Sequence, residues 1–238
     1  MVDVALVTGG TGSIGRAICD RLVADGFNVL AADPVEPEQT RSGQTWIELD
    51  VRSSASVQRA VDRASTLGTL KVLVNAHGVL RETDMLKLAD DAMQAVIEVN
   101  LQGVARTCSA VSRVIADGGA IVNLSSVTAS MGRTANAFIY QATKAGVESI
   151  TRSYAVGLAR REVRVNCIAP GYLSEPMRGE GSVLRSRQGG NDALKSFTPF
   201  GRLVTPDEVA EVVAFLCSSR ASGVSGVVLP VDGAQRAY

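Results

Sequence analysis

The feature that most constrains this fold lies in the first 33 residues, where two short apolar runs flank a glycine-rich turn and a helical segment. The run Val4–Val7 enters the turn Thr8-Gly9-Gly10-Thr11-Gly12-Ser13-Ile14-Gly15, and a second run, Phe27–Ala32, stops at Asp33. The β-branched residues before the turn predict a strand, and Arg16 to Ala24 after it has a helix-like pattern. We therefore expect a compact strand, turn, helix and strand that ends in an acid.

This unit has the pattern of a dinucleotide site. Gly10, Gly12 and Gly15 fit G-x-G-x-x-G, in which the glycines allow a tight turn, close approach of the backbone to a pyrophosphate, and close helix–strand packing. Asp33 follows Gly15 by 18 residues, where a carboxylate can accept hydrogen bonds from a ribose diol. Its charge would repel a 2′-phosphate, so the pattern favours NAD over NADP. The competing interpretation is an ordinary glycine-rich turn that ends in a solvated aspartate.

Charge and composition limit the partners. Lys plus Arg and Asp plus Glu both number 24 in 238 residues, and neither sign forms a long block. This balance gives no sign of a nucleic-acid or membrane surface, so we expect a small-molecule partner. The sequence opens Met1-Val2-Asp3 directly before a strand, without a basic and apolar leader, and no stretch approaches the roughly 18 uncharged apolar residues of a membrane span. These features predict a cytoplasmic protein.

The cysteines and the histidine argue against a metal centre. Cys19, Cys108, Cys167 and Cys217 lie far apart and form no C-x-x-C motif, a pattern typical of reduced, mostly buried thiols. Because His77 is the only histidine, a zinc site built from histidine and cysteine is hard to assemble. We therefore expect chemistry that needs no bound metal.

Short β-branched runs alternate with longer amphipathic segments along the whole chain. The expected strands are Val4–Val7, Asn28–Ala32, Thr45–Leu49, Val72–Asn75, Ala120–Leu124, Val163–Ile168 and Val227–Val231, and the expected helices are Ile14–Asp25, Ala55–Leu67, Asp90–Ala116, Ala137–Arg160 and Pro206–Ser218. This alternation predicts an α/β fold, a doubly wound parallel sheet of about seven strands with helices on both faces. Since no linker or repeat interrupts it, residues 1–238 are expected to form one domain.

The tract 175–198 departs from this alternation. It has no clean period and contains four glycines, and an irregular insertion of this length is usually functional, so we expect a lid over the substrate. Apolar side chains that could wall a substrate pocket are Met131, Phe138, Tyr172, Leu173, Met177, Leu184, Phe197 and Phe200, although lid and core packing would account for them equally. After the tract, Thr205-Pro206-Asp207-Glu208 predicts a capped helix start.

Tyr140 and Lys144 lie four residues apart within the expected helix 137–160, which places phenol and ammonium on one face. A free tyrosine titrates near pKa ~10, and a neighbouring ammonium, joined by the cationic nicotinamide of an oxidised cofactor, would lower that pKa. The phenol could then exchange a proton near neutral pH. Taken alone, Tyr-x-x-x-Lys is more often an ordinary helix face.

Other polar residues accompany this pair. The strand Ala120–Leu124 delivers Ser125 and Ser126 to a carboxyl end just before the Tyr140 helix, where a hydroxyl could hold a substrate oxygen or simply cap the following turn. Asn100 is an amide within an amphipathic segment, and it could bridge Lys144 to water or make a structural hydrogen bond.

From Val4 to Gly233 the chain resembles the short-chain dehydrogenase/reductase family. The residues that carry the resemblance are the glycine turn, Asp50-Val51, Asn75-Ala76-His77-Gly78, Asn100, Ser126, Tyr140 with Lys144, Pro170-Gly171 and Val231-Asp232-Gly233. The resemblance implies a Rossmann-like fold and a homotetramer or homodimer packed through the helices that hold Asn100 and Tyr140.

The resemblance also implies roles. Tyr140 would be the catalytic acid/base, Lys144 would bind the nicotinamide ribose and lower the tyrosine pKa, Ser126 would position the substrate oxygen, and Asn100 would hold the water of a proton relay. The expected cofactor-binding residues are Gly9, Gly10, Thr11, Gly12, Ser13, Ile14, Gly15, Asp33, Asp50, Val51, Asn75, Ala76, His77, Gly78, Tyr140, Lys144, Pro170, Gly171, Leu173 and Glu175. For His77 a structural hydrogen bond or packing is favoured over catalysis.

Three positions depart from the family pattern. Ser13 stands where T-G-x-x-x-G-x-G has glycine, which predicts a modest local rearrangement, and Ser126 precedes Tyr140 by 14 positions, one more than expected, so the loop between them is expected to bulge. Glu175 follows Ser174 where the family commonly has a threonine that contacts the nicotinamide amide. Either Ser174 takes over that contact and Glu175 faces solvent, or Glu175 accepts a bond from the carboxamide and favours cationic NAD⁺.

The sequence thus predicts a metal-free, NAD-dependent enzyme that interconverts a secondary alcohol and a ketone. One alternative is a 3-oxoacyl-thioester reductase, which the closing half resembles in Gly201-Arg202-Leu203 and Pro206-Asp207-Glu208, with Arg178, Arg185, Arg187 and Lys195 available for a phosphate. The other is a non-catalytic dinucleotide-sensing protein, a reading that the presence of serine, tyrosine, lysine and asparagine disfavours.

Overall fold

In the part of the chain that a computed structural model describes, residues 2–39, 41–132, 135–175, 177 and 190–237, seven parallel strands form one sheet in the order β3-β2-β1-β4-β5-β6-β7. The strands are β1 (Asp3–Thr8), β2 (Asn28–Asp33), β3 (Gln44–Glu48), β4 (Thr69–Asn75), β5 (Ala120–Leu124), β6 (Arg164–Pro170) and β7 (Val228–Val231). The chain runs outward from β1 to β3 and then returns to the other side of β1 to form β4. Ligands of such sheets bind outside the carboxyl ends at this reversal.

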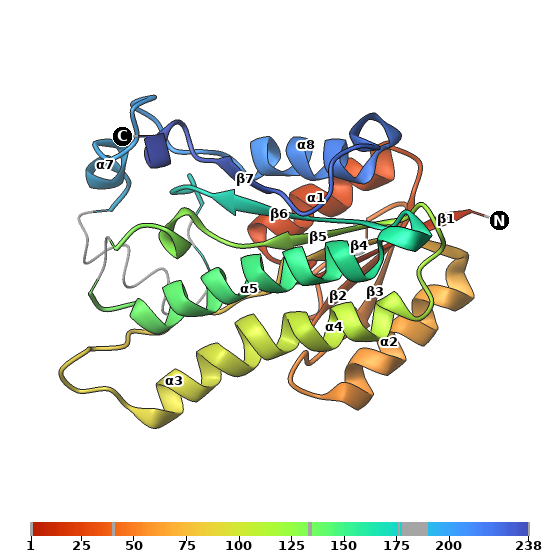
Figure 1. The fold of residues 1–238 in the computed structure, drawn as a ribbon, viewed down its shortest axis with the longest axis horizontal. Helices are drawn as coiled ribbons and strands as arrows, with labels where there is room; N and C mark the ends of the chain where they lie inside the picture. The colour runs from red at the N-terminus through yellow and green to blue at the C-terminus, as the bar shows by residue number, and fades with distance from the viewer. Residues whose placement is uncertain (1, 40, 133–134, 176, 178–189, 238) are drawn as a thin grey trace.

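Helices cover both faces of the sheet (Figure 1). The longer ones are α1 (Ser13–Ala24), α2 (Ser54–Leu67), α3 (Asp90–Ile97), the π-helical turn η1 (Glu98–Gln102), α4 (Gly103–Ser112), α5 (Phe138–Gly157), α7 (Gly190–Lys195) and α8 (Pro206–Cys217); 3₁₀ turns lie at η2 (Val127–Ala129), η3 (Ala159–Arg161), η4 (Ser219–Ala221) and η5 (Gln235–Ala237). α1 and α8 lie together on one face, and α2, α4 and α5 on the other.

The core consists of two apolar layers, one on each face of the sheet. Along β1, Val4 and Leu6 point into the layer under α2, α4 and α5, whereas Ala5 and Val7 point into the layer under α1 and α8. Both faces of a central parallel strand are covered, so an unbroken apolar run is what such a strand requires. The four cysteines are free, with Cys19, Cys108 and Cys167 buried, as the sequence predicts. No helix among the described residues is long and apolar enough to cross a membrane.

The predicted α/β class and seven strands are confirmed, and most boundaries agree within a few residues. The largest error concerns the expected helix 90–116, which is three segments and ends at Ser112. Its middle, η1, is a π-helical turn in which the Gly103 N–H bonds to the carbonyl of Glu98, five residues back. The amphipathic period does not reveal such a one-residue slip in hydrogen bonding.

Two further boundaries have clear local causes. α5 ends at Gly157, earlier than the predicted Arg160, and the chain then passes through η3 into Glu162, which has a left-handed φ of 55°. The predicted cap of α8 is confirmed, because Thr205 and Glu208 form a reciprocal capping box. The expected lid lies mostly outside the described residues; within them, Gly190–Lys195 forms α7.

Candidate functional site

The glycine turn joins β1 to α1 and leaves no room for side chains at its tightest points. Gly9 has a φ of +70°, and a Cβ there would lie 2.6 Å from the backbone N of His77. A Cβ on Gly15 would lie 2.0 Å from the Gly9 carbonyl oxygen. Gly12, the N-cap of α1, has a φ of −69°, and a Cβ there would lie 3.3 Å from the Gly9 carbonyl oxygen. A Cβ on Gly10 would lie 2.9 Å from the Cβ of Ala31. The turn thus needs Gly9 for its φ and both Gly10 and Gly15 for close packing, whereas the spacing argument used Gly10, Gly12 and Gly15 and did not include Gly9.

The free N–H groups at the start of α1 face a cavity of about 790 Å³ that extends along the carboxyl ends of the strands. Glycine turn, helix N-terminus and cavity together make a cradle that fits a dinucleotide pyrophosphate. Ser13, the departure from the family pattern, is simply the first residue of α1 and lines the cavity beside Ile14.

Asp33 ends β2 at the edge of the same cavity and is only 7% exposed. Its Oδ2 accepts from the Thr11 N–H at 3.3 Å, and its Oδ1 accepts from the Val35 N–H at 3.0 Å. These two bonds fix the carboxylate while each oxygen keeps a lone pair for a further donor. The position therefore fits the ribose-binding acid expected from the sequence.

Most of the expected cofactor-binding residues line this cavity. They are Gly9, Gly12, Ser13, Ile14, Gly15, Asp33, Asp50, Val51, Ala76, His77, Gly78, Tyr140, Lys144, Pro170, Gly171, Leu173 and Glu175, with Ser126 beside them. Gly10 and Thr11 instead line a neighbouring cavity of about 650 Å³.

Asn75 does not reach the cavity either. Its amide is fully buried and bonds to Asn123 at 2.8 Å and Thr107 at 2.8 Å, so it joins β4 to β5 and α4. Sequence reasoning missed Val79, Leu80, Thr128 and Gln141, which also line the cavity. Val79 and Leu80 follow Gly78 directly, so the rule that ligands bind beyond strand carboxyl ends could have found them.

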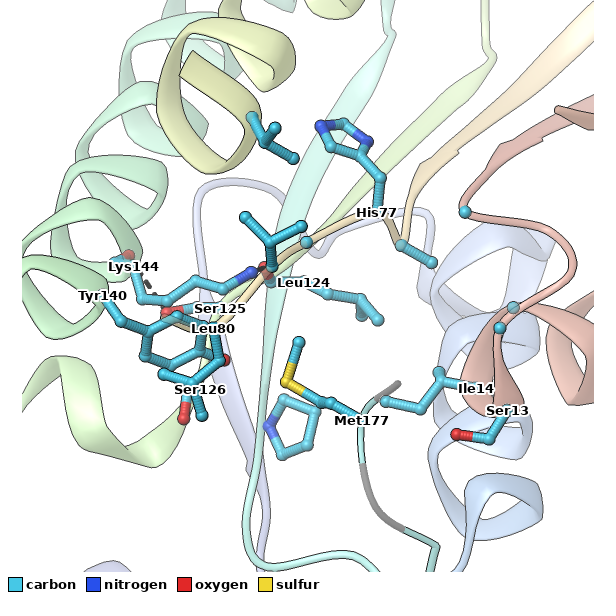
Figure 2. A pocket seen from close by; sticks show the side chains of 18 of the residues that line it. Ser13, Ile14, His77, Leu80, Leu124, Ser125, Ser126, Tyr140, Lys144 and Met177 are labelled. Carbon is cyan, nitrogen blue, oxygen red and sulfur yellow. Dashed lines mark hydrogen bonds between the residues drawn. The ribbon is translucent and has the colours of Figure 1, made fainter. Parts of the chain in front are cut away.

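Tyr140, Ser126 and Lys144 gather on one side of the cavity, opposite Ser13 and Ile14 (Figure 2). The Ser126 hydroxyl lies close enough to the Tyr140 phenol to favour its ionised form. Ser126 also caps η2, accepting from the Thr128 N–H at 3.3 Å, so the capping role and the place beside the phenol coexist. Lys144 is 3% exposed, and its Nζ donates to the Leu124 carbonyl at 2.8 Å and lies 5.6 Å from the centre of the Tyr140 ring.

Burial dominates the ionisation of both groups in the protein alone. It raises the pKa of Tyr140 to about 12, against the opposing effect of the Ser126 hydrogen bond, and it lowers the pKa of Lys144 to about 8. The lysine alone therefore does not produce the acidified phenol expected from the sequence. The free-energy cost of burying a phenolate is larger than the stabilisation it gains from the Lys144 ammonium, which donates to the Leu124 carbonyl.

Ser125 also lines the cavity, but its hydroxyl bonds to residues of α5. Its hydroxyl is buried and lies 3.0 Å from both the Lys144 carbonyl and a Glu148 carboxylate oxygen. The Ser125 hydroxyl thus supports α5, the helix that carries Tyr140. Of the two serines, Ser126 is the one whose hydroxyl lies beside the phenol.

Asn100 lies in η1, fully buried, and its side chain clamps one peptide of the loop after β4. The Val79 N–H donates to Oδ1 at 2.8 Å, and Nδ2 donates to the Val79 carbonyl at 2.8 Å. A Cβ on Gly78 would lie 3.4 Å from Oδ1 of Asn100 and 3.5 Å from Nζ of Lys144, so both groups converge on Gly78. The side chain makes structural bonds, as one of the two sequence interpretations proposed.

Glu175 is exposed, as one of the two sequence interpretations proposed, and lies beside α1. Its carboxylate lies 4.0 Å from the Arg16 guanidinium, and both side chains are about half exposed. Such an exposed, long ion pair contributes little to stability. The contact places the carboxylate at the rim of the cavity beside the glycine turn, on the same side as the start of α1.

The apolar wall is only partly as expected. Tyr172, Leu173 and Met177 line the cavity, whereas Met131 and Phe138 do not. Phe197 and Phe200 are 42% and 66% exposed, so they do not wall it either, and Leu184 lies outside the described residues.

His77 is buried at the end of β4, with Nδ1 2.6 Å from Oγ1 of Thr8. Burial, with a smaller effect from the Lys144 charge, lowers the pKa of His77 to about 3 from its usual 6.5. The structural role favoured by the sequence agrees with this contact.

The lowered pKa predicts a specific loss of stability in acid. The unfolded chain binds this proton near pH 6.5 and the folded chain only near pH 3, so the free energy of unfolding falls as the pH drops through that range. At pH 5 the loss from this group is about 2 kcal/mol. Urea unfolding at pH 7 and pH 5 should therefore show a smaller pH-dependent loss in His77→Asn than in the parent, by about that amount. Equal losses in the two proteins would contradict the prediction.

Comparison with known proteins agrees with this geometry. A family model described as enoyl-(acyl carrier protein) reductase matches residues 9–234. The chain belongs to the short-chain dehydrogenase/reductase family. It is thus an oxidoreductase of a family that binds a nicotinamide dinucleotide.

Relatives within the short-chain dehydrogenase/reductase family match over nearly the whole length. The chain is 39% identical to cis-4-hydroxycyclohexanecarboxylate dehydrogenase of Sinomonas cyclohexanicum, covering 97% of this chain and 95% of the relative. It is 37% identical to the 3-oxoacyl-[acyl-carrier-protein] reductase MabA of Mycobacterium tuberculosis, covering 96% and 90%. Among solved structures, ligand-free aldohexose dehydrogenase of Thermoplasma acidophilum superimposes with a TM-score of 0.91 at 28% identity, covering 100% of this chain and 95% of that one.

Proposed function

We propose that this protein is an NAD-dependent dehydrogenase that interconverts a secondary alcohol and a ketone. The observation that carries the proposal is the grouping of Tyr140, Ser126 and Lys144 on one wall of a cavity whose opposite wall is the glycine turn. The 39% identical relative is named as a dehydrogenase of a hydroxycyclohexane carboxylate, a ring that bears a secondary alcohol, and this name supports the substrate class.

Each residue has a defined task in this proposal. A bound nicotinamide ring supplies the hydride acceptor for alcohol oxidation and the hydride donor for ketone reduction. The positive charges of Lys144 and of a bound oxidised nicotinamide would together favour the Tyr140 phenolate, which would take the hydroxyl proton during oxidation. During reduction the neutral phenol would return the proton, and Ser126 would hold the same oxygen by a hydrogen bond. Lys144, still mostly protonated below its pKa of about 8, holds a ribose hydroxyl and keeps positive charge near the phenol. Asn100 fixes the loop after β4, next to which a water can connect Lys144 to solvent.

A substrate survey tests the proposal directly. Secondary alcohols with NAD⁺ or NADP⁺, and ketones with NADH or NADPH, are followed by the absorbance of the reduced cofactor. We expect turnover of at least one cyclic or aryl-alkyl pair, with NAD(H) preferred. Binding of NAD(H) without turnover of any pair would instead favour the non-catalytic dinucleotide-sensing alternative.

The preference for NAD is proposed to rest on Asp33. At about 4 Å a unit charge near a protein surface interacts with another by about 4 kcal/mol, so a 2′-phosphate beside this carboxylate is strongly disfavoured. Asp33→Asn keeps the shape and one acceptor oxygen but removes the charge. We expect the ratio of NADP⁺ to NAD⁺ dissociation constants to fall by about 100-fold, with NAD⁺ itself bound more weakly. Asp50→Asn is a matched control, since this carboxylate lines the same cavity but pairs with Arg52; an equal effect there would contradict the assignment.

A second candidate is a 3-oxoacyl-thioester reductase, which the 37% identity to MabA favours. Among the basic residues expected to meet a phosphate, Lys195 pairs with Asp192 at 2.8 Å. Arg202, part of the resemblance to the reductases, pairs with Glu208 at 2.7 Å. Arg178, Arg185 and Arg187 lie outside the described residues. Acetoacetyl-CoA with NADPH, added to the survey, separates the two candidates.

A further inference from the structure

The buried imidazole of His77 faces the π-helical turn that carries Asn100. Figure 2 shows the ring extending from the end of β4 towards the yellow-green helical segment. A Cβ on Gly103, the residue that follows η1, would lie 2.9 Å from Nε2 of His77, so the ring packs directly against this turn. Nε2 is buried and has no well-aligned hydrogen-bond partner among the described residues, although the backbone of Val99 lies close enough to favour a proton on the ring.

The π-helical slip explains why Val99 offers an acceptor. In an α-helix the Gly103 N–H would bond to the Val99 carbonyl, four residues back. Here the Gly103 N–H bonds to the Glu98 carbonyl instead, so the Val99 carbonyl does not receive the donor that α-helical geometry would give it. A carbonyl in this position requires another donor when it is buried.

The tautomer of His77 suits that carbonyl. Of the acceptors around Oγ1 of Thr8, Nδ1 of His77 is the nearest at 2.6 Å, compared with 3.3 Å for Asn75 and 3.4 Å for the Val74 carbonyl. In the tautomer in which Thr8 donates to Nδ1, the neutral imidazole carries its one proton on Nε2. That proton faces η1.

We propose that His77 is a positioning residue that donates from Nε2 to the Val99 carbonyl and thereby holds the π-helical turn in the register in which Asn100 clamps Val79. His77 and Val79 are two residues apart in the loop after β4, and Val99 and Asn100 are neighbours on the turn. The two contacts tie these segments together side by side. Loss of the first allows η1 to relax towards α-helical hydrogen bonding and swings the Asn100 amide off the Val79 peptide.

A pair of variants that differ by one methylene tests this. In His77→Asn the amide can reach Thr8 but not the turn, whereas in His77→Gln it can reach the Val99 carbonyl. Amide hydrogen exchange is measured at Val79, whose N–H donates to Asn100, and at Ala76, whose N–H donates to the Thr8 carbonyl and serves as internal reference. We expect exchange at Val79 relative to Ala76 to accelerate about tenfold in His77→Asn and to stay within about threefold of the parent in His77→Gln.

Controls separate positioning from general destabilisation. Val213→Ala, in the apolar layer under α8, lowers global stability without touching η1 and should leave the Val79 to Ala76 ratio unchanged. An unchanged ratio in His77→Asn, or an equal change in both His77 variants, would overturn the proposal. These exchange measurements need no turnover, so their outcome does not depend on the proposed function.

A kinetic measurement tests the consequence for catalysis and rests on the proposed function. We expect His77→Asn to lower kcat by about tenfold while the cofactor dissociation constant stays within about threefold, and His77→Gln to recover most of kcat. A His77→Asn protein with accelerated Val79 exchange and unchanged kcat would overturn the link from His77 to turnover.

Discussion

Replacing Tyr140 with phenylalanine is expected to lower kcat by about 10²–10⁴-fold, the range typical for loss of a general acid–base group. The change removes one oxygen and leaves the ring, so packing against the cavity wall is kept. Ser126 loses its phenol partner but keeps its bonds to Thr128, the nearer at 3.0 Å, and therefore stays in place. The cofactor dissociation constant should stay within about threefold, because the glycine turn and Asp33 hold most of the dinucleotide and are untouched. Steady-state kinetics with cofactor titration measures both quantities.

Tyr154→Phe is the matched control. Tyr154 lies on the same helix, α5, packs against the core and does not line the cavity, so loss of its hydroxyl should leave kcat near that of the parent. A Tyr140→Phe protein that retains parental turnover would show that another group exchanges the proton. Equal losses in both variants would show that the effect comes from α5 as a whole.

The sheet was predictable because its signal is local and strong. β5 matches the expected Ala120–Leu124 at both ends, since a short run that is apolar except for Asn123 is typical of a buried parallel strand. The side-by-side placement of Tyr140 and Lys144 was equally accessible, because a helix fixes residues four apart on one face. The ionisation of Tyr140 and Lys144 was harder to predict, because burial sets the direction of both pKa shifts and the sequence does not quantify burial.

The errors arise where a tertiary contact overrides the local pattern. At the slip in η1, Asn100 bonds to Val79, 21 residues earlier in the chain, and no period within residues 90–116 encodes this contact. Asn75 was expected in the cofactor cleft and instead joins β4 to β5 through Asn123, a contact that exists only once the strands are paired. The glycine motif shows the same limit, because spacing identifies the turn but not which glycine each contact needs.

The glycine turn therefore supplies the second large prediction. Gly15 lies inside α1, and helix propensity alone says that alanine there should stabilise the protein by about 1 kcal/mol. The structure predicts the opposite sign. The new Cβ would lie 2.0 Å from the Gly9 carbonyl oxygen, and both partners are backbone, so no side-chain rotation relieves the overlap. We expect Gly15→Ala to lower the free energy of unfolding by about 3 kcal/mol or more, which corresponds to a Tm lower by roughly 10 °C, measured without cofactor.

Gly12→Ala separates this steric account from the motif itself. Both glycines belong to G-x-G-x-x-G, but at Gly12 φ is −69° and the new Cβ would have its nearest neighbour at 3.3 Å. The expected cost is at most about 1 kcal/mol, mainly because alanine is a poorer N-cap than glycine. If both variants lost stability equally, the motif as a unit rather than the Gly9–Gly15 contact would govern the turn. If Gly15→Ala were as stable as the parent, α1 must be able to shift away from β1, and the close helix–strand packing that shapes the dinucleotide cradle would not be required.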